Sequence, residues 1–165
     1  MRARMATWLY QMQPNNPEIW GGGVTPERVR VRLERLCKRR RPVAWPTGWQ
    51  YRRDLHPGDR LLLYLGPSVG NPGIYGVGLV IENHTRARTV ALRFLREETR
   101  RLSRYPFPLL SYPLLCKRVL QGWRRKTLFP VSPTSARVLT QALSRWMRTR
   151  HRPPGQRSRA TITCR

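Results

Sequence analysis

The hydrophobic and polar positions of the chain follow two different periods. Short apolar runs bounded by glycine, proline and polar clusters are typical of strands, and they occupy residues 6–12, 43–46, 60–65, 74–81 and 90–95. In residues 25–38 and 132–147 the apolar residues instead recur every three or four positions, which predicts amphipathic helices. Short strands with helices inserted between them predict an α+β fold built on a small mixed β-barrel.

Local signals support these elements. Thr25-Pro26-Glu27 supplies an N-cap threonine, a proline at the first helical position and an acid in the first turn, and Ser132-Pro133 repeats the first two features. A further short helix is predicted at 114–120, and an apolar loop at 106–113. No element is predicted for the polar stretch 96–104. Glycines within 74–81 predict a close backbone approach or a sharp bend.

One folded domain is predicted, from residue 6 to residue 147. Residues 1–5 and 148–165 are expected to be disordered, because the latter segment holds six arginines, no acid and only Ile162 as a large aliphatic residue. The longest apolar run, 61–65, is far shorter than the roughly 20 residues that cross a bilayer. We expect neither a membrane protein nor a conventionally secreted one, and the scattered cysteines favour a reducing cytoplasm.

The charge balance is unusual. The chain has 33 Lys and Arg residues against 8 Asp and Glu residues, a formal net charge of +25. A GC-rich genome can explain why nearly all the cations are arginine, but not why acids fall far below the roughly one residue in eight of an ordinary chain. Such a domain repels itself unless a polyanion compensates, and phosphates fit the guanidinium fork. Nucleic acid is therefore the expected partner; no helix pairs a basic face with a strongly apolar one, so a membrane surface is not expected.

Patterns that carry catalysis are scarce. The acids form no D-x-D or H-x-E pattern, and the three histidines fall in turns or in the basic tail. Gly21-Gly22-Gly23 is not followed by a lysine and a serine or threonine, so it is not an NTPase phosphate loop. The cysteines, Cys37, Cys116 and Cys164, lack metal-ligand spacing, and the first two are expected to fill the core. We predict no enzyme activity, no metal and no cofactor.

Aromatic residues concentrate in the first half of the chain. Trp8 and Tyr64 are expected in the core, whereas Trp45 and Trp49 flank Pro46-Thr47-Gly48 at the end of a predicted strand. A nucleobase stacked on an exposed tryptophan gains about 1–3 kcal/mol. Extracting that base from a duplex costs a few kcal/mol, so a second wall and polar contacts to the base edge would be needed.

Several motifs occur in a familiar order. Trp8-Leu9-Tyr10-Gln11-Met12-Gln13-Pro14 is similar to the opening W-L-F-Q-x-N-P signature of EVE domains, which belong to the PUA-like superfamily and are related to YTH domains. Trp45, Pro57–Tyr64 and Gly73–Val80 then follow as in that family, and Leu128–Pro133 resembles its end. The resemblance covers roughly residues 6–147 and implies a PUA-like barrel with inserted and C-terminal helices.

The resemblance implies binding of a flipped, often modified base in an aromatic pocket. By position, Trp45 matches the family's stacking tryptophan. Gln13 falls where the family often has an asparagine on the base edge, and Pro46 and Thr47 fall where backbone and a small side chain meet the base.

Two departures from the family pattern affect this pocket. Gln13 is one methylene longer than asparagine, which leaves the identity of the base open. No tryptophan follows Gly76-Val77-Gly78, where YTH domains carry a second wall. Either Trp49, Trp8 or Tyr10 supplies that wall, or the pocket is more open and less selective.

The expected function is therefore a nucleic-acid-binding module that reads a modified or extruded base, with DNA as the expected ligand. The residues expected to hold phosphates are Arg39, Arg40, Arg41, Arg52 and Arg53. The run 38–41 could equally be a solvated helix end, where cations are favoured. Base identity, oligomeric state and any partner protein such as a nuclease stay open.

Two alternatives remain. A basic RNA-binding or ribosome-associated protein without a base pocket would carry the same charge. ASCH domains share the PUA-like fold and some resemble nucleoside amidohydrolases with a Lys, a Glu and an Arg before the G-D turn; here residues 48–54 lack the Lys and the Glu.

Overall fold

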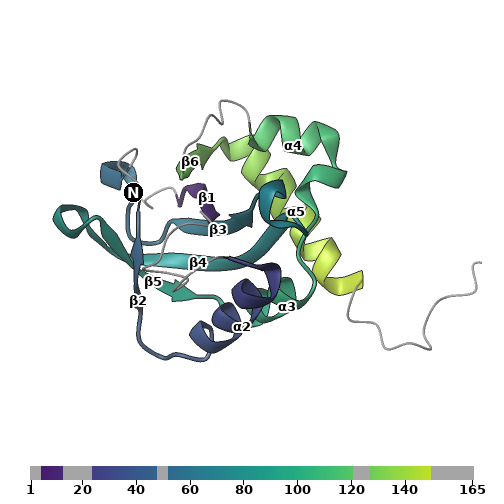
Figure 1. Cartoon of the computed structure of the whole chain (residues 1–165). Helices are drawn as coiled ribbons and strands as arrows, with labels where there is room; N and C mark the ends of the chain where they lie inside the picture. Colours follow the sequence, from purple (N-terminus) through teal and green to yellow (C-terminus); the bar gives the residue numbers. More distant parts are fainter. Residues whose placement is uncertain (1–4, 13–23, 48–51, 121–126, 150–165) are drawn as a thin grey trace, which may run out of the picture.

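One mixed sheet forms the centre of the protein. The structure, a computed structural model, describes residues 5–12, 24–47, 52–120 and 127–149. The strands follow the order β2-β5-β4-β3-β1-β6 (Figure 1). They are β1 (Thr7–Met12), β2 (Val43–Pro46), β3 (Arg60–Leu65), β4 (Gly73–His84), β5 (Thr89–Phe94) and β6 (Leu128–Val131). The helices are α2 (Pro26–Leu36), α3 (Arg96–Arg104), α4 (Pro113–Val119) and α5 (Pro133–Thr149).

Strand pairing confirms the expected mixed α+β class. β1 runs parallel to β3, with Trp8 opposite Leu61, whereas the other neighbouring strands are antiparallel. A parallel pair needs a crossover connection, and the chain from 24 to 47, which contains α2 and β2, lies within it. The predicted glycine contact is also present, because a Cβ on Gly78 would lie 2.6 Å from the Leu92 side chain.

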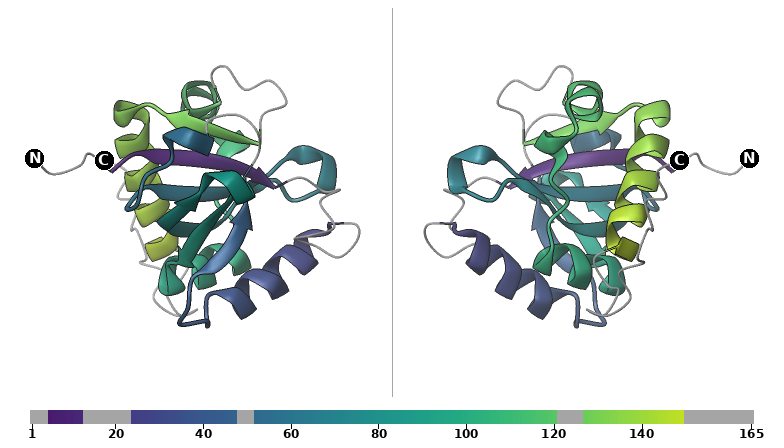
Figure 2. Two further views of the ribbon diagram at one scale, coloured as in Figure 1. Left: turned by 90° about the vertical axis from the view of Figure 1, so that its left-hand side faces the viewer. Right: turned by 90° about the vertical axis from the view of Figure 1, so that its right-hand side faces the viewer.

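The sheet curls but does not close, which corrects the expected barrel. No pairing joins β2 to β6 in the described part of the chain. In a flat sheet β2 and β1 would lie about 19 Å apart, because three strands separate them; yet the rings of Trp45 and Tyr10 are 5.8 Å apart. Pro46 and Pro130 sit on the two edge strands, where the missing N–H removes a ladder donor. Figure 2 shows the curl.

Two hydrophobic clusters line the two faces of the sheet. On β1, Trp8, Tyr10 and Met12 belong to one cluster, which contains α2 residues such as Leu33. Leu9 points the other way, into a cluster covered by α3, α4 and α5. Cys37 lies buried in the first cluster and Cys116 packs against the second, as predicted. None of the described helices has the length and hydropathy needed to cross a membrane.

The polar stretch 96–104, for which no element was predicted, forms α3. Glu97 and Glu98 lie in its first turn and Arg101 and Arg104 in its last, which suits the helix dipole. The hydroxyl of Thr99 accepts a hydrogen bond from the Val77 N–H at 3.2 Å and donates to the Val77 carbonyl at 3.0 Å. Leu102 is the one large apolar residue of α3, and it is buried. The sequence of this segment therefore lacks the apolar periodicity that predicts a helix.

Three boundaries differ from those predicted. Helix α5 runs to Thr149, two residues beyond the expected domain end. Strand β4 extends to His84 and forms a long hairpin with β5. The expected apolar loop 106–113 contains a short 3-10 turn, and Phe107 pairs with Ile74 through both backbone hydrogen bonds, each 3.0 Å long. Residues 1–4 and 150–165, which belong to the segments expected to be disordered, lie outside the described residues.

Candidate functional site

The candidate base site lies where β2 ends. Trp45 is opposite Val90 and Pro46 is opposite Thr89 on β5. One residue further, the Thr47 N–H donates to the Arg88 carbonyl at 2.8 Å. The β4–β5 hairpin therefore holds Trp45 and Thr47 in fixed positions at the edge of the sheet.

Trp45 is part of the hydrophobic core. Its side chain is only 2% exposed. The rings of Tyr10 and Phe94 meet it edge-on, at centroid distances of 5.8 and 5.6 Å and interplanar angles of 70° and 77°. A base can therefore stack on Trp45 only after the residues that cover the ring move.

Thr47 carries a buried polar atom. The residue is 8% exposed, and its hydroxyl oxygen is buried without a hydrogen-bond partner among the residues that the structure describes. Leaving such a group unpaired costs about 1–3 kcal/mol. A ligand with a polar edge would recover that cost on binding here.

The other aromatic candidates are held by the core. Trp8 is 5% exposed, and its indole N–H donates to Asp59 at 3.0 Å. Tyr10 is 2% exposed and belongs to the same cluster. Gln13 and Trp49 lie outside the described residues.

The sequence analysis did not single out Asp59 as a residue of this region. Its carboxylate accepts hydrogen bonds from the N–H groups of Ala6 and His56, both at 2.9 Å, as well as from Trp8. The carboxylate thereby fixes the start of β1 against the turn before β3. The Gly58-Asp59 turn, with Gly58 at a φ of 93°, was the sequence signal for this position.

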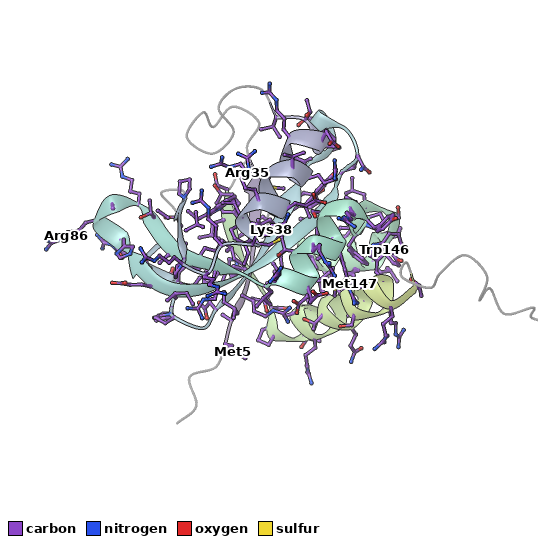
Figure 3. The ribbon with its side chains drawn as sticks, turned by 90° about the horizontal axis from the view of Figure 1, so that it is seen from below. Met5, Arg35, Lys38, Arg86, Trp146 and Met147 are labelled. Carbon is purple, nitrogen blue, oxygen red and sulfur yellow. The ribbon has the colours of Figure 1, made fainter. Side chains whose placement is uncertain are left out.

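Arginines flank β2 at both ends. Arg39, Arg40 and Arg41 are exposed between α2 and β2, and Arg53 is exposed in the 3-10 turn Arg52–Asp54. Arg86 is exposed in the turn between β4 and β5 and projects from the hairpin (Figure 3). None of these five arginines forms an ion pair with an acid of the described segments. Of Arg52, only the backbone is described.

Helix α2 has two different charged sides. On one side Arg30 pairs with Glu27 and Glu34, and Glu34 also receives a hydrogen bond from Arg104 at 3.1 Å. The hydrogen bond from Arg30 lowers the pKa of Glu27. These four residues neutralise one another, so this side of the helix is a poor phosphate surface.

On the other side of α2, Arg32 and Arg35 are three residues apart, and Arg39 follows just beyond the end of the helix. Burial lowers the pKa of the Arg32 guanidinium, and the charges of Arg35 and Arg39 lower it further. An anion placed among these groups relieves the repulsion. Figure 3 is seen from the side on which α2 lies and shows Arg35 and Lys38 there.

Groups that could bind metal or act as nucleophiles are few in the described part of the chain. It contains no cluster of three or more His, Cys, Asp or Glu side chains. Burial raises the pKa of the thiols of Cys37 and Cys116, which makes them weaker nucleophiles.

The curled mixed α+β sheet with helices on both faces agrees with the fold that the resemblance to EVE domains implied. Among solved structures, the chain is similar to human thymocyte nuclear protein 1 (THYN1) in complex with 5-methylcytosine-containing DNA, at 16% identity and a TM-score of 0.54, over 90% of this chain and 99% of that one.

Two further structures support the fold. The DUF55 domain of human thymocyte nuclear protein 1 is 15% identical with a TM-score of 0.55, over 84% of this chain and 99% of that one. Rpa0253 from Rhodopseudomonas palustris is 16% identical with a TM-score of 0.51, over 85% of this chain and 94% of that one. No family model matches the sequence, and no curated protein matches it significantly. At these identities the likeness shows a common fold.

Proposed function

We propose that this chain is a nucleic-acid-binding module that takes a flipped, modified DNA base into the site at the end of β2. The observation that carries the proposal is the buried Thr47 hydroxyl without a described partner, next to Trp45. The structure of THYN1, which has the same fold, contains DNA with 5-methylcytosine. That base is accordingly the first modification to test.

The arginines supply the affinity in this proposal. Arg39, Arg40 and Arg41 precede β2, and Arg86 lies near its other end. Four residues of strand span about 13 Å, the axial length of about four nucleotides of one DNA strand. Basic groups at both ends of β2 can therefore hold the backbone on either side of one extruded nucleotide.

The free-energy balance explains why the site needs a polar contact. Stacking supplies about 1–3 kcal/mol, which is close to the few kcal/mol lost when a base leaves the duplex. Uncovering Trp45 adds a further cost. A hydrogen bond from the base edge to Thr47 removes a penalty of about 1–3 kcal/mol that the free protein already carries.

The test is the Thr47→Val variant, which removes the hydroxyl but keeps the shape. Fluorescence anisotropy would compare duplexes with one 5-methylcytosine and with cytosine. Wild type should prefer the modified duplex, and Thr47→Val should lose about five- to tenfold of that preference with little change for the unmodified duplex. The same variant should unfold at equal or slightly higher urea concentration, because it removes an unpaired buried group.

Thr89→Val, the same change on the opposite strand, is the matched control and should keep the preference. Equal behaviour of the two variants would show that the Thr47 hydroxyl does not contact the base. A structured RNA serves as a third ligand, because tighter binding of RNA than of either duplex would favour the alternative of a basic RNA-binding protein.

A further inference from the structure

A second concave surface lies far from β2 in the fold, between α4 and α5. This groove has a volume of about 730 Å³ and includes Tyr112, Leu114, Val138 and Trp146 in its lining. On α5 the lining residues are 138, 141, 142, 145, 146 and 149, which form one face of the helix. They extend over about 16 Å of helix axis, a length that suits a peptide of about three turns.

The walls of the groove are apolar and exposed. Leu114 is 80% exposed, and Tyr112 and Val138 are each 41% exposed. Several neighbouring large apolar side chains in contact with solvent commonly mark an interaction surface. The exposed part of α4 is therefore a surface that a partner would cover.

Two aromatic side chains of the groove are already fixed. Trp146 donates its indole N–H to the Tyr105 carbonyl at 2.9 Å and meets Phe107 edge-on at 6.0 Å. Tyr112 stacks on Phe107 at 5.1 Å with an interplanar angle of 12°. Because these rings are held in place before binding, this protein loses less side-chain entropy when a partner docks.

The charged residues of the groove favour an acidic ligand. Arg118 and Arg145 line it, neither forms an ion pair with a described acid, and none of the described lining residues is acidic. A second copy of a chain with a net charge of +25 would be repelled. Residues 150–165, with five arginines and no acid, would be repelled as well.

We propose that the groove between α4 and α5 binds an acidic amphipathic helix of a partner protein. Apolar side chains at helical spacing on the partner would cover Leu114, Val138 and Trp146, and flanking carboxylates would meet Arg118 and Arg145. This surface is separate from the β2 site, so the two proposals fail independently.

The probe is a fluorescein-labelled peptide of about 15 residues, with leucines along one helical face and glutamates on the rest. Its control is a scrambled peptide of the same composition, because any acidic peptide is attracted to so basic a protein. At about 0.15 M salt, which shortens electrostatic attraction to about 8 Å, the full chain should bind the ordered peptide at least about tenfold more tightly.

Two pairs of variants locate the site. Leu114→Gln should weaken binding of the ordered peptide about tenfold, whereas Leu110→Gln, an exposed leucine outside the groove, should not. Arg145→Gln should weaken it more than Arg93→Gln, an exposed arginine of β5 that changes the net charge equally. Because all four side chains are exposed, each variant should keep the fold, which circular dichroism would verify.

Equal binding of the ordered and scrambled peptides, or equal effects within either pair, would overturn the proposal and leave only non-specific attraction. A labelled DNA duplex is titrated against the same variants. If Leu114→Gln weakens duplex binding as much as peptide binding, the groove belongs to a nucleic-acid surface and the peptide proposal is wrong.

Discussion

At the scale of single residues, Asp59 connects three parts of the chain. Its two oxygens accept from the Ala6 N–H, the His56 N–H and the Trp8 indole at distances of 2.9 to 3.0 Å. Asp59 is 2% exposed, so these bonds are shielded from water. The carboxylate sets the position of Trp8 and the start of β1.

Asp59→Asn should therefore destabilise the protein. The amide nitrogen would replace one acceptor oxygen and leave at least one buried N–H unpaired, which costs about 1.5–3 kcal/mol for a bond to a charged group. The free energy of unfolding in urea measures this loss. Asp54→Asn, at an exposed aspartate nearby, should stay within about 0.5 kcal/mol of wild type; similar losses for both variants would contradict the role of Asp59.

Two buried phenols give the stability a pH dependence. Burial raises the pKa of Tyr64 and of Tyr75 from 10.0 to about 12. The unfolded chain releases these protons near its ordinary pKa while the folded protein still holds them. The stability from these two groups is thus fully present below pH 10 and is lost as the pH rises toward 12.

The expected slope is a loss of about 1.4 kcal/mol per pH unit for each tyrosine. Urea unfolding between about pH 9 and 11.5 measures it, and Tyr64→Phe should lower the slope by about 1.4 kcal/mol per pH unit. A pH-independent free energy of unfolding over that range would show that the phenols are not protected.

At the scale of elements, one side of α2 carries acidic and basic residues that neutralise one another, and the other side is positively charged. Glu27, Arg30, Glu34 and Arg104 form the neutralised side. The sequence signals Thr25-Pro26-Glu27 predicted this helix correctly, and the Thr25 hydroxyl accepts from the Arg28 N–H at 3.2 Å as an N-cap should. Which arginines stay unpaired could not be predicted, because Arg104 reaches Glu34 from α3, 70 residues away.

The positive side of α2 should contribute to the salt dependence of nucleic-acid binding. Replacing Arg32, Arg35 and Arg39 by glutamine should lower the slope of log K against log salt by about two to three, because each lost phosphate contact removes about 0.9. Anisotropy titrations with one DNA duplex at several salt concentrations measure this slope. The preference for a modified base should be unchanged.

The matched control replaces Arg137, Arg145 and Arg148 on α5 by glutamine and changes the net charge equally. This variant should keep a steeper slope than the α2 variant. If the two variants lose equal slope, net charge alone drives binding, and α2 has no specific part in it.

The sequence pattern predicted most of the strands but not every helix. Strands β1 to β5 were predicted to within a few residues because runs such as Leu61–Leu65 are continuous and are bounded by turns. Helix α3 was missed because its place depends on the Thr99 hydroxyl bonding to Val77 rather than on an apolar stripe. An interaction of that kind joins residues 22 apart and leaves no local pattern.

At the scale of the whole molecule, the curvature of the sheet determines which side chains surround Trp45. The sequence placed Trp45 at a strand end, but its contact with Tyr10 requires β2 to fold over toward β1. Packing between neighbouring strands also shapes the sheet, for example the close fit of the Leu92 side chain on Gly78. The sequence therefore predicted the strand that ends at Trp45, but not that the tryptophan would be covered.

In this account, the net charge provides affinity for nucleic acid and the strand-end site provides selectivity for one base. Arginines attract the phosphates of any nucleic acid, and that attraction weakens with salt. The contacts proposed between one base and Trp45 and Thr47 would act at short range inside the protein, so they should be nearly insensitive to salt. Affinity and selectivity should therefore respond differently to the same change of conditions.

The most direct measurement is the affinity of the full chain for a 5-methylcytosine duplex and for its unmodified counterpart, each titrated from about 50 to 200 mM salt. Both affinities should fall steeply, while their ratio stays above one and nearly constant. A ratio of one at every salt concentration, or a ratio that disappears as salt rises, would contradict the account.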